Sequence, residues 1–307
     1  MTLDNYLDDL KDGAKPLRRS GLLQLTGLSS EEVARLKAVW AEMPARRKCD
    51  ILGGLVELSE DNLELDFAAV FRAALADDDD GVRERATRGL WDCDDRIIIR
   101  PLIDLLTHDA SAAVRTAAAL SLGRFAAMAQ DGKVLRRDAE RIREALFSVI
   151  DRSEEELEVR RRAIEAVAAF NSPEVERVIV EAYQSGAPPL MQSAIYAMGR
   201  SSDSRWLPTV LDKTHHEDPA IRYEAATACG QLGDEATVPH LIRLIQDDDF
   251  QVQLSAVEAL GAIGGPLARR ALLQCTKLGE EPLEAAAQTA LRNVDFEEDP
   301  LGFRFRA

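Results

Sequence analysis

Histidine and acidic side chains come together once in this sequence, in the run His215-His216-Glu217-Asp218. Imidazole nitrogens and carboxylate oxygens bind iron and zinc, so such a run could supply part of a metal centre. The chain has only four histidines, however, and this run holds its one His-Glu pair. A centre for two metal ions needs several such pairs on different helices, so we interpret the run as a polar turn and expect no bound metal.

Four consecutive aspartates, Asp77 to Asp80, precede Gly81 and resemble part of a calcium-binding loop. Such a loop needs carboxylates at its first and twelfth positions and a glycine at its sixth. When Gly81 takes the sixth position, Ala76 takes the first and Thr87 the twelfth. Both lack a carboxylate, and we predict an ordinary solvated turn instead.

The cysteines and the loops give no catalytic pattern. Cys49, Cys93, Cys229 and Cys275 lie far apart and form no Cys-x-x-Cys pair, so we expect reduced, packed thiols. The sequence has no glycine-rich phosphate loop and no signature of a nucleophile with its base. We therefore predict a protein that is not an enzyme and holds no cofactor.

The charge balance disfavours several kinds of partner. With 38 basic and 54 acidic residues the net charge is −16, which opposes binding to nucleic acid and to anionic membranes. No stretch reaches the ~20 apolar residues of a membrane span, and the N-terminal segment lacks a basic-then-apolar targeting pattern. We expect a soluble cytoplasmic protein, and the sequence leaves its oligomeric state open.

One helical pattern organises most of the chain. An apolar residue is followed after four positions by alanine, after seven by a small residue and after eight by an apolar one, and these positions make one helical face. The pattern begins at Val82, Val114, Val159, Leu190, Ile221, Val252 and Leu283, with spacings of 32, 45, 31, 31, 31 and 31. Its alanines are Ala86, Ala118, Ala163, Ala194, Ala225, Ala256 and Ala287. Alanine at the centre of a contact lets helices approach closely, so these helices must pack on copies of themselves.

Each repeat also contains another apolar helix, which precedes the patterned one. It often opens with proline, which is at home in a first helical turn, as at Pro101, Pro173, Pro208, Pro239 and Pro266. Glycine occurs near the end of several patterned helices and predicts left-handed caps there, at Gly123, Gly199, Gly230 and Gly261. Helix-turn-helix units of this size are stable only when they stack, so we predict an all-α fold, a right-handed α-α superhelix.

The Pro-Leu-Ile-x-Leu-Leu helix, the aspartate-rich turn and the Val-Arg-x-x-Ala-x-x-x-Leu helix resemble HEAT repeats of the short bacterial type, which also occur in phycobilin lyases. The resemblance covers residues 77–294 and implies a HEAT-repeat solenoid. It also implies a ladder between repeats, built from a turn carboxylate six residues before an arginine. The matching pairs are Asp77/Arg83, Asp109/Arg115 and Glu154/Arg160. Met191 breaks the pattern, so we expect an interrupted ladder in the C-terminal half.

The repeats divide the chain into three regions. Residues 1–76 form a helical capping region, residues 77–294 the repeat array, and residues 295–307 a C-terminal tail. The array carries an insertion near residues 126–138, which is either functional or an extended helix and loop. In the capping region, Ser29-Ser30-Glu31-Glu32 predicts a helix that begins with a capping box.

The exposed face of the patterned helices is the candidate working surface, because in HEAT-like arrays these helices line a concave groove. The predicted groove residues are Arg88, Trp91, Leu120, Arg161, Gln192, Tyr196, Tyr223 and Leu254. Tryptophan, tyrosine and arginine often anchor interfaces, although a solvated face with scattered rings is the alternative. We predict a non-catalytic adaptor or scaffold that binds another protein or a peptide segment. A bilin-lyase-like or other small-molecule role is the second hypothesis, and Glu84, Glu165 and Glu258 argue against a basic DNA-binding groove.

Overall fold

The computed structural model describes residues 3–12, 15–277 and 279–298 of the chain. These residues form helices and no strand, as the sequence predicted. The chain divides into two compact units, Met1–Ala166 and Val167–Ala307.

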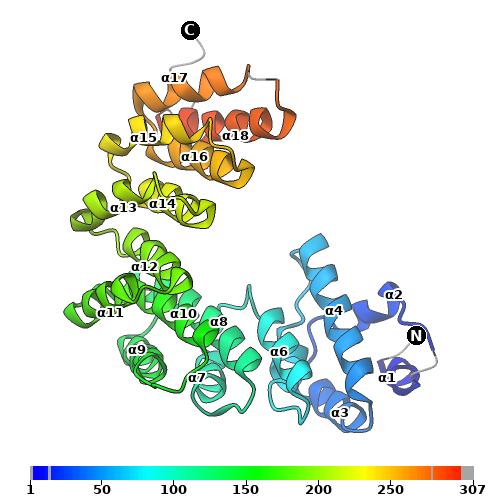
Figure 1. Cartoon of the computed structure of the whole chain (residues 1–307). Coiled ribbons are helices and arrows are strands. Elements are labelled where there is room, and N and C mark those ends of the chain that lie inside the picture. Colours follow the sequence, from blue (N-terminus) through cyan, green and yellow to red (C-terminus); the bar gives the residue numbers. More distant parts are fainter. Residues whose placement is uncertain (1–2, 13–14, 278, 299–307) are drawn as a thin grey trace. The chain divides into compact units, whose positions relative to one another are not determined.

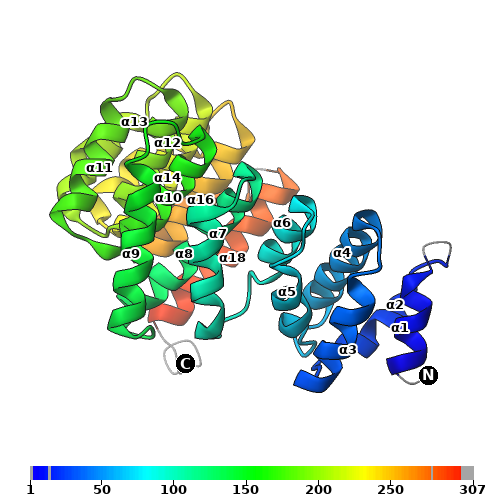
Figure 2. The same cartoon turned by 90° about the horizontal axis from the view of Figure 1, so that it is seen from below.

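The N-terminal unit is built from ten helices within its described residues (Figure 1). They are α1 (Leu3–Lys11), α2 (Arg19–Leu22), α3 (Ser30–Trp40), α4 (Ala45–Asp61), α5 (Ala68–Ala74), α6 (Asp80–Gly89), α7 (Ile99–His108), α8 (Ala112–Gln130), α9 (Arg136–Ile150) and α10 (Leu157–Val167), with the 3-10 turns η1 (Leu23–Leu25) and η2 (Arg96–Ile98). Helix α4 packs on α6, and α6 packs on α8. Figure 2 shows α3 and α5 along one edge of this unit and α4 and α6 along the other.

The C-terminal unit repeats one helix pair four times in its described part. Its helices are α11 (Pro173–Gln184), α12 (Pro188–Arg200), α13 (Leu207–Lys213), α14 (Pro219–Leu232), α15 (Val238–Leu244), α16 (Phe250–Ile263), α17 (Gly265–Cys275) and α18 (Glu281–Glu298), with the 3-10 turns η3 (Ala168–Phe170), η4 (Ser204–Trp206) and η5 (Glu235–Thr237). Figure 1 shows two layers, with α11, α13, α15 and α17 on one side and α12, α14, α16 and α18 on the other. The patterned helices α12, α14, α16 and α18 pack on one another in sequence.

The alanine pattern forms the core, as predicted. All seven alanines at the fourth offset are fully buried, from Ala86 to Ala287. Six of the seven first residues are buried as well, and Leu190 is half-buried. Small side chains at these contacts let the helix axes approach closely, and the flanking larger residues fill the space around them.

The predicted glycine caps are wrong. Gly123, Gly199, Gly230 and Gly261 lie inside α8, α12, α14 and α16. A Cβ on Gly230 would lie 2.9 Å from Cα of Ala259, and a Cβ on Gly261 would lie 2.8 Å from Cβ of Ala290. The glycines are needed because the next patterned helix approaches there, whereas the left-handed cap of α14 is Gly233, with φ of 66°.

A ladder of charged side chains joins neighbouring repeats in the N-terminal unit. Arg83 donates to both carboxylate oxygens of Asp109 at 2.7 and 2.8 Å, and its Nη1 donates to the Asp77 carbonyl at 2.8 Å. Each arginine therefore binds its own turn and the carboxylate of the next one. Arg115 continues the ladder to Glu155 at 2.6 Å. We predicted Glu154 as the carboxylate of this turn, and this is wrong, because the adjacent Glu155 forms the ion pair.

The ladder also continues in the C-terminal unit. Arg222 donates to both oxygens of Asp247 at 2.7 Å and to the His216 carbonyl at 2.8 Å. The predicted interruption occurs at Met191, whose side chain has no charged group to offer, and the ladder is weakened again at Gln253. Gln253 donates to the Asp247 carbonyl at 2.6 Å and so replaces only half of an arginine rung.

The irregular regions are helical too. Helix α8 extends to Gln130 and α9 begins at Arg136, so the insertion consists of an extended helix and a short loop. Helix α3 begins with the predicted capping box, in which Ser29 Oγ accepts from the Glu32 N–H and the Glu32 carboxylate accepts from the Ser29 N–H. The predicted tail begins inside α18, and residues 299–307 lie outside the described residues.

Candidate partner-binding surface

Trp91 marks the most exposed aromatic position that we predicted for the groove. Helix α6 ends at Gly89, Leu90 turns into the core, and the Trp91 side chain stays 47% exposed. Arg124 of α8 holds this segment, since it donates to the carbonyls of Trp91 at 2.7 Å and Asp92 at 3.1 Å. The same guanidinium pairs with Asp94. The hydrogen bonds from Arg124 therefore fix the backbone of Trp91, while its ring remains accessible to solvent.

A pocket of about 370 Å³ lies beside Trp91, between α4, α6 and α8. Three predicted groove residues line it, Arg88, Trp91 and Leu120, so the structure brings them together. The other lining residues are Val56, Glu60, Leu90, Ala117, Ser121, Arg124 and Phe125. Sequence reasoning missed Val56 and Arg124, which lie outside the offsets that we used to define the groove.

The pocket occurs where the repeat pattern changes. Four of the patterned helices have glycine nine residues after their first residue, and each glycine faces the small residue of the next repeat, as Gly123 faces Ala166 at 3.1 Å. In the first repeat the same position is Trp91, and its counterpart in the next repeat is Ser121. Both line the pocket. An indole cannot occupy the space that glycine leaves between closely packed helices, so the ring stays at the surface.

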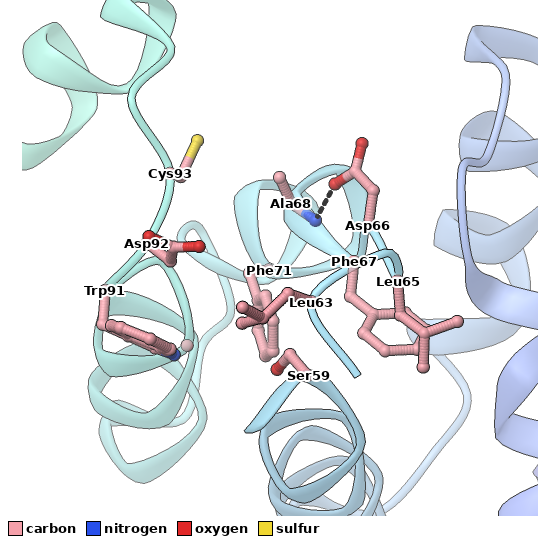
Figure 3. Close-up of a pocket in the computed structure, with 11 residues that line it drawn as sticks. Ser59, Leu63, Leu65, Asp66, Phe67, Ala68, Phe71, Trp91, Asp92 and Cys93 are labelled. Atoms are coloured by element: carbon pink, nitrogen blue, oxygen red, sulfur yellow. Dashed lines mark hydrogen bonds between the residues drawn. The ribbon is translucent and has the colours of Figure 1, made fainter. Parts of the chain in front are cut away.

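Trp91 also lines a smaller pocket of about 200 Å³. Figure 3 shows Trp91 at one end, Phe67 with Leu65 at the other, and Leu63 and Phe71 between them. Leu63 follows α4 in a loop and is 77% exposed, the largest value among the exposed large apolar side chains of the described chain. We define the Trp91 surface as Val56, Leu63, Trp91 and Leu120.

The two arginines next to the Trp91 surface are already paired. Arg88 forms an ion pair with Glu84 one helical turn earlier, and Arg124 pairs with Asp94. Exposed pairs of this kind contribute little to stability, but they leave the pocket without a cation that awaits an anionic ligand. The surface therefore offers mainly apolar contact.

The other predicted groove residues lie elsewhere. Arg161 is on α10 and pairs with Glu158 at 2.9 Å. Gln192 of α12 donates to Glu224 of α14 at 3.3 Å. Tyr196 and Leu254 are half-buried on α12 and α16, and Tyr223 is exposed on α14. Gln192, Tyr196, Tyr223 and Leu254 thus occupy three successive patterned helices of the C-terminal unit, α12, α14 and α16.

The histidine run divides between two environments. The rings of His215 and His240 lie 5.8 Å apart, and Arg243 Nη2 lies 3.1 and 2.9 Å from a nitrogen of each. Burial, the Arg243 charge and His215 all lower the pKa of His240. His216 instead accepts from the Asp218 N–H at 3.1 Å. Within the described residues, no three histidine, cysteine or acidic side chains gather in a way that could hold a metal ion.

The four cysteines are unpaired thiols with little nucleophilic character. Burial raises the pKa of Cys229 to about 12 and also raises the pKa values of Cys49, Cys93 and Cys275. A thiol reacts as its thiolate, so these groups are poor nucleophiles at neutral pH. This includes Cys93, which lines the pocket of Figure 3.

The stacked helix pairs, the alanine contacts and the arginine ladder define an α-α solenoid. The sequence pattern of HEAT repeats matches residues 68–146 and 207–292, more than half of the chain. The protein belongs to the HEAT-repeat family. Among the described residues, no helix is long and apolar enough to cross a membrane.

One solved structure supports the fold, and others are similar at lower scores. Yeast importin-beta matches with a TM-score of 0.56 and 13% identity, over 95% of this chain and 46% of that one. The complex of CpcE and CpcF of phycocyanin lyase from Nostoc gives a TM-score of 0.49 and 16% identity, over 74% of this chain and 94% of that one. Human deoxyhypusine hydroxylase gives 0.38 and 18%, over 95% and 96%. The search of curated proteins gives no match.

Proposed function

We propose that this protein is a non-catalytic adaptor of the cytoplasm that binds a segment of another protein through its patterned helices. The observation that carries the proposal is the Trp91 surface. There a half-exposed indole and the exposed Leu120 border an open pocket of about 370 Å³. Aromatic anchors beside a pocket are typical of the residues that dominate binding energy at protein interfaces.

The pairing of nearby charges supports a protein segment with an apolar anchor as the ligand. Because Arg88 and Arg124 are paired within the chain, an acidic ligand would have to displace those partners. An apolar side chain needs no such exchange, since it gains free energy by covering Trp91 and Leu120. We propose that Tyr196 and Tyr223 of the C-terminal unit contact the same partner further along its length.

The test begins with affinity isolation of partners from native cells with the wild-type chain and two matched variants. Leu120→Ala and Leu267→Ala remove leucines that are each 43% exposed, but only Leu120 belongs to the Trp91 surface. A true partner should be depleted by Trp91→Ala and Leu120→Ala and retained by Leu267→Ala.

Calorimetry with the purified partner then measures each change. We expect Trp91→Ala to weaken binding by ~2 kcal/mol and Tyr196→Ala and Tyr223→Ala by ~1–2 kcal/mol each. The melting temperatures of Trp91→Ala and Tyr223→Ala should change little, because both side chains are exposed. Normal binding by the Trp91 and Leu120 variants would show that the partner uses another face.

A further inference from the structure

A larger cavity lies at the other end of the N-terminal unit, away from the Trp91 surface in sequence. Its volume is about 560 Å³, within the range of ~300–1,000 Å³ that small-molecule sites occupy. Residues of α1, of α2 and its preceding loop, of η1 and of the start of α4 line it. They are Tyr6, Asp9, Leu10, Lys15, Pro16, Leu17, Arg18, Ser20, Gly21, Gln24 and Arg47.

Arg47 is the central polar group of this cavity. Its side chain is buried, with only 8% of the residue exposed. Nε donates to the Leu10 carbonyl at 3.2 Å and Nη1 to the Lys15 carbonyl at 2.9 Å. In the part of the chain that the structure describes, Arg47 forms no ion pair with a carboxylate. A buried cation held only by neutral carbonyls is poorly compensated, and an anion in the cavity would complete its interactions.

The other charged groups that line the cavity also leave an excess of positive charge. Arg18 lies exposed at the cavity and has no carboxylate partner within the described ranges, whereas the Lys15 charge is offset by Asp9. Two guanidinium groups therefore remain without a carboxylate, in a chain whose net charge is −16. A local excess of positive charge in an acidic protein favours an anionic ligand over a cationic one.

The apolar part of the cavity comes from Leu10, Leu17, Pro16 and Tyr6. The Tyr6 ring lies across Gly21, where an added Cβ would come within 2.3 Å of the ring. Glycine at this position thus makes room for the ring. The Tyr6 hydroxyl is buried and, among the described residues, has no hydrogen-bond partner. A buried unsatisfied hydroxyl is costly, and a small movement of the ring toward a bound ligand would relieve it.

We propose that this cavity binds a small amphiphilic organic anion. A carboxylate or phosphate head lies against Arg47 and Arg18, and an apolar body lies along Leu10, Leu17 and the Tyr6 ring. Guanidinium groups match both kinds of head through paired N–H donors. The proposal is independent of the adaptor function, because it involves a different part of the N-terminal unit.

The test uses three probes with different head groups on alkyl chains of roughly seven or eight carbons: octanoate, octyl phosphate and octanol. We expect one or both anions to bind the full-length protein at least tenfold more tightly than octanol in calorimetry, because only they pair with the guanidinium groups. Tighter binding of octanoate identifies a carboxylate site, and tighter binding of octyl phosphate identifies a phosphate site. Equal binding of all three probes, or no binding at millimolar concentrations, overturns the proposal.

Two neighbouring arginines provide matched variants. Arg18→Gln removes a lining charge and should weaken anion binding about tenfold. Arg19→Gln removes a charge that pairs with Asp61 outside the cavity, and it should leave binding unchanged. Arg47→Gln should abolish binding; if its melting curve shows a disrupted N-terminal unit, the Arg18 and Arg19 variants decide. Equal affinities of Arg18→Gln and Arg19→Gln would show that the cavity does not hold the anion.

Discussion

The glycines inside the patterned helices allow a sharp test of the packing. Gly230 lies within α14 where α16 approaches, and a Cβ there would lie 2.9 Å from Cα and 3.0 Å from Cβ of Ala259. Carbon atoms in favourable contact lie ~3.5–4.0 Å apart, so Gly230→Ala requires the two helices to separate by roughly half an ångström or more. The obstructing atoms belong to the backbone of a neighbouring helix and cannot rotate away.

Two opposing effects determine how Gly230→Ala changes the free energy of unfolding. Replacing glycine by alanine in a helix interior stabilises the helix by about 1 kcal/mol. Overpacking a close contact costs ~1–3 kcal/mol. Because backbone atoms make the clash, we expect a cost in the upper part of that range, ~2–3 kcal/mol, and therefore a net loss of ~1–2 kcal/mol. Urea unfolding followed by circular dichroism measures this, and the melting temperature should fall by about 2–4 °C per kcal/mol.

Gly53 is the matched control, because it also lies inside a helix, α4. A Cβ there would meet only the Arg85 guanidinium, at 3.8 Å, which is an ordinary contact. Gly53→Ala should therefore stabilise the protein by ~1 kcal/mol through helix propensity alone. If Gly230→Ala stabilises the protein as Gly53→Ala does, α14 and α16 are not as close as described and the explanation of the glycine pattern is refuted.

Three further predictions test burial and charge. Ala225→Leu should cost ~1–3 kcal/mol in urea unfolding, because Ala225 is fully buried; an unchanged midpoint would contradict that packing. Burial pushes the pKa of Asp247 up, but hydrogen bonds from Arg222 and the Asp249 N–H outweigh it and lower the pKa below 3.8. Its stabilisation is present above pH ~4 and is lost as pH falls further, so Asp247→Asn should unfold more easily at pH 7 and respond less to acid. The lowered pKa of His240 means that stability should decline as pH falls below 6.5, and His240→Gln should remove that decline from pH titrations of the melting temperature.

The fold was predictable from the sequence because one physical requirement recurs. Close approach of neighbouring helices admits only a small residue at the central contact, so burial selects alanine at the same offset each time, as at Ala118 and Ala256. A ladder residue depends on finer geometry. Glu154 and Glu155 differ by one position in a turn, and only the folded backbone decides which carboxylate faces Arg115.

The candidate site was predictable only in part. Arg88 on α6 and Leu120 on α8 occupy the same offset of two neighbouring patterned helices, and the helical period therefore brought both to one pocket. Leu63 lies in a loop, where no helical period predicts its position. Arg124 belongs to the neighbouring repeat and contacts the site by donating to the Trp91 carbonyl. The residues that line the N-terminal cavity belong to no sequence repeat, so only tertiary folding brings them together.

The glycine positions connect the packing of the fold with the location of the candidate site. Where the ninth offset is glycine, as in α14 and α16, the next patterned helix closes over it and leaves no room for a side chain at that position. Where that offset is Trp91, the helix ends earlier and a pocket opens between α6 and α8. A departure from the repeat at a position of close packing therefore changes the surface more than a substitution at an exposed offset does.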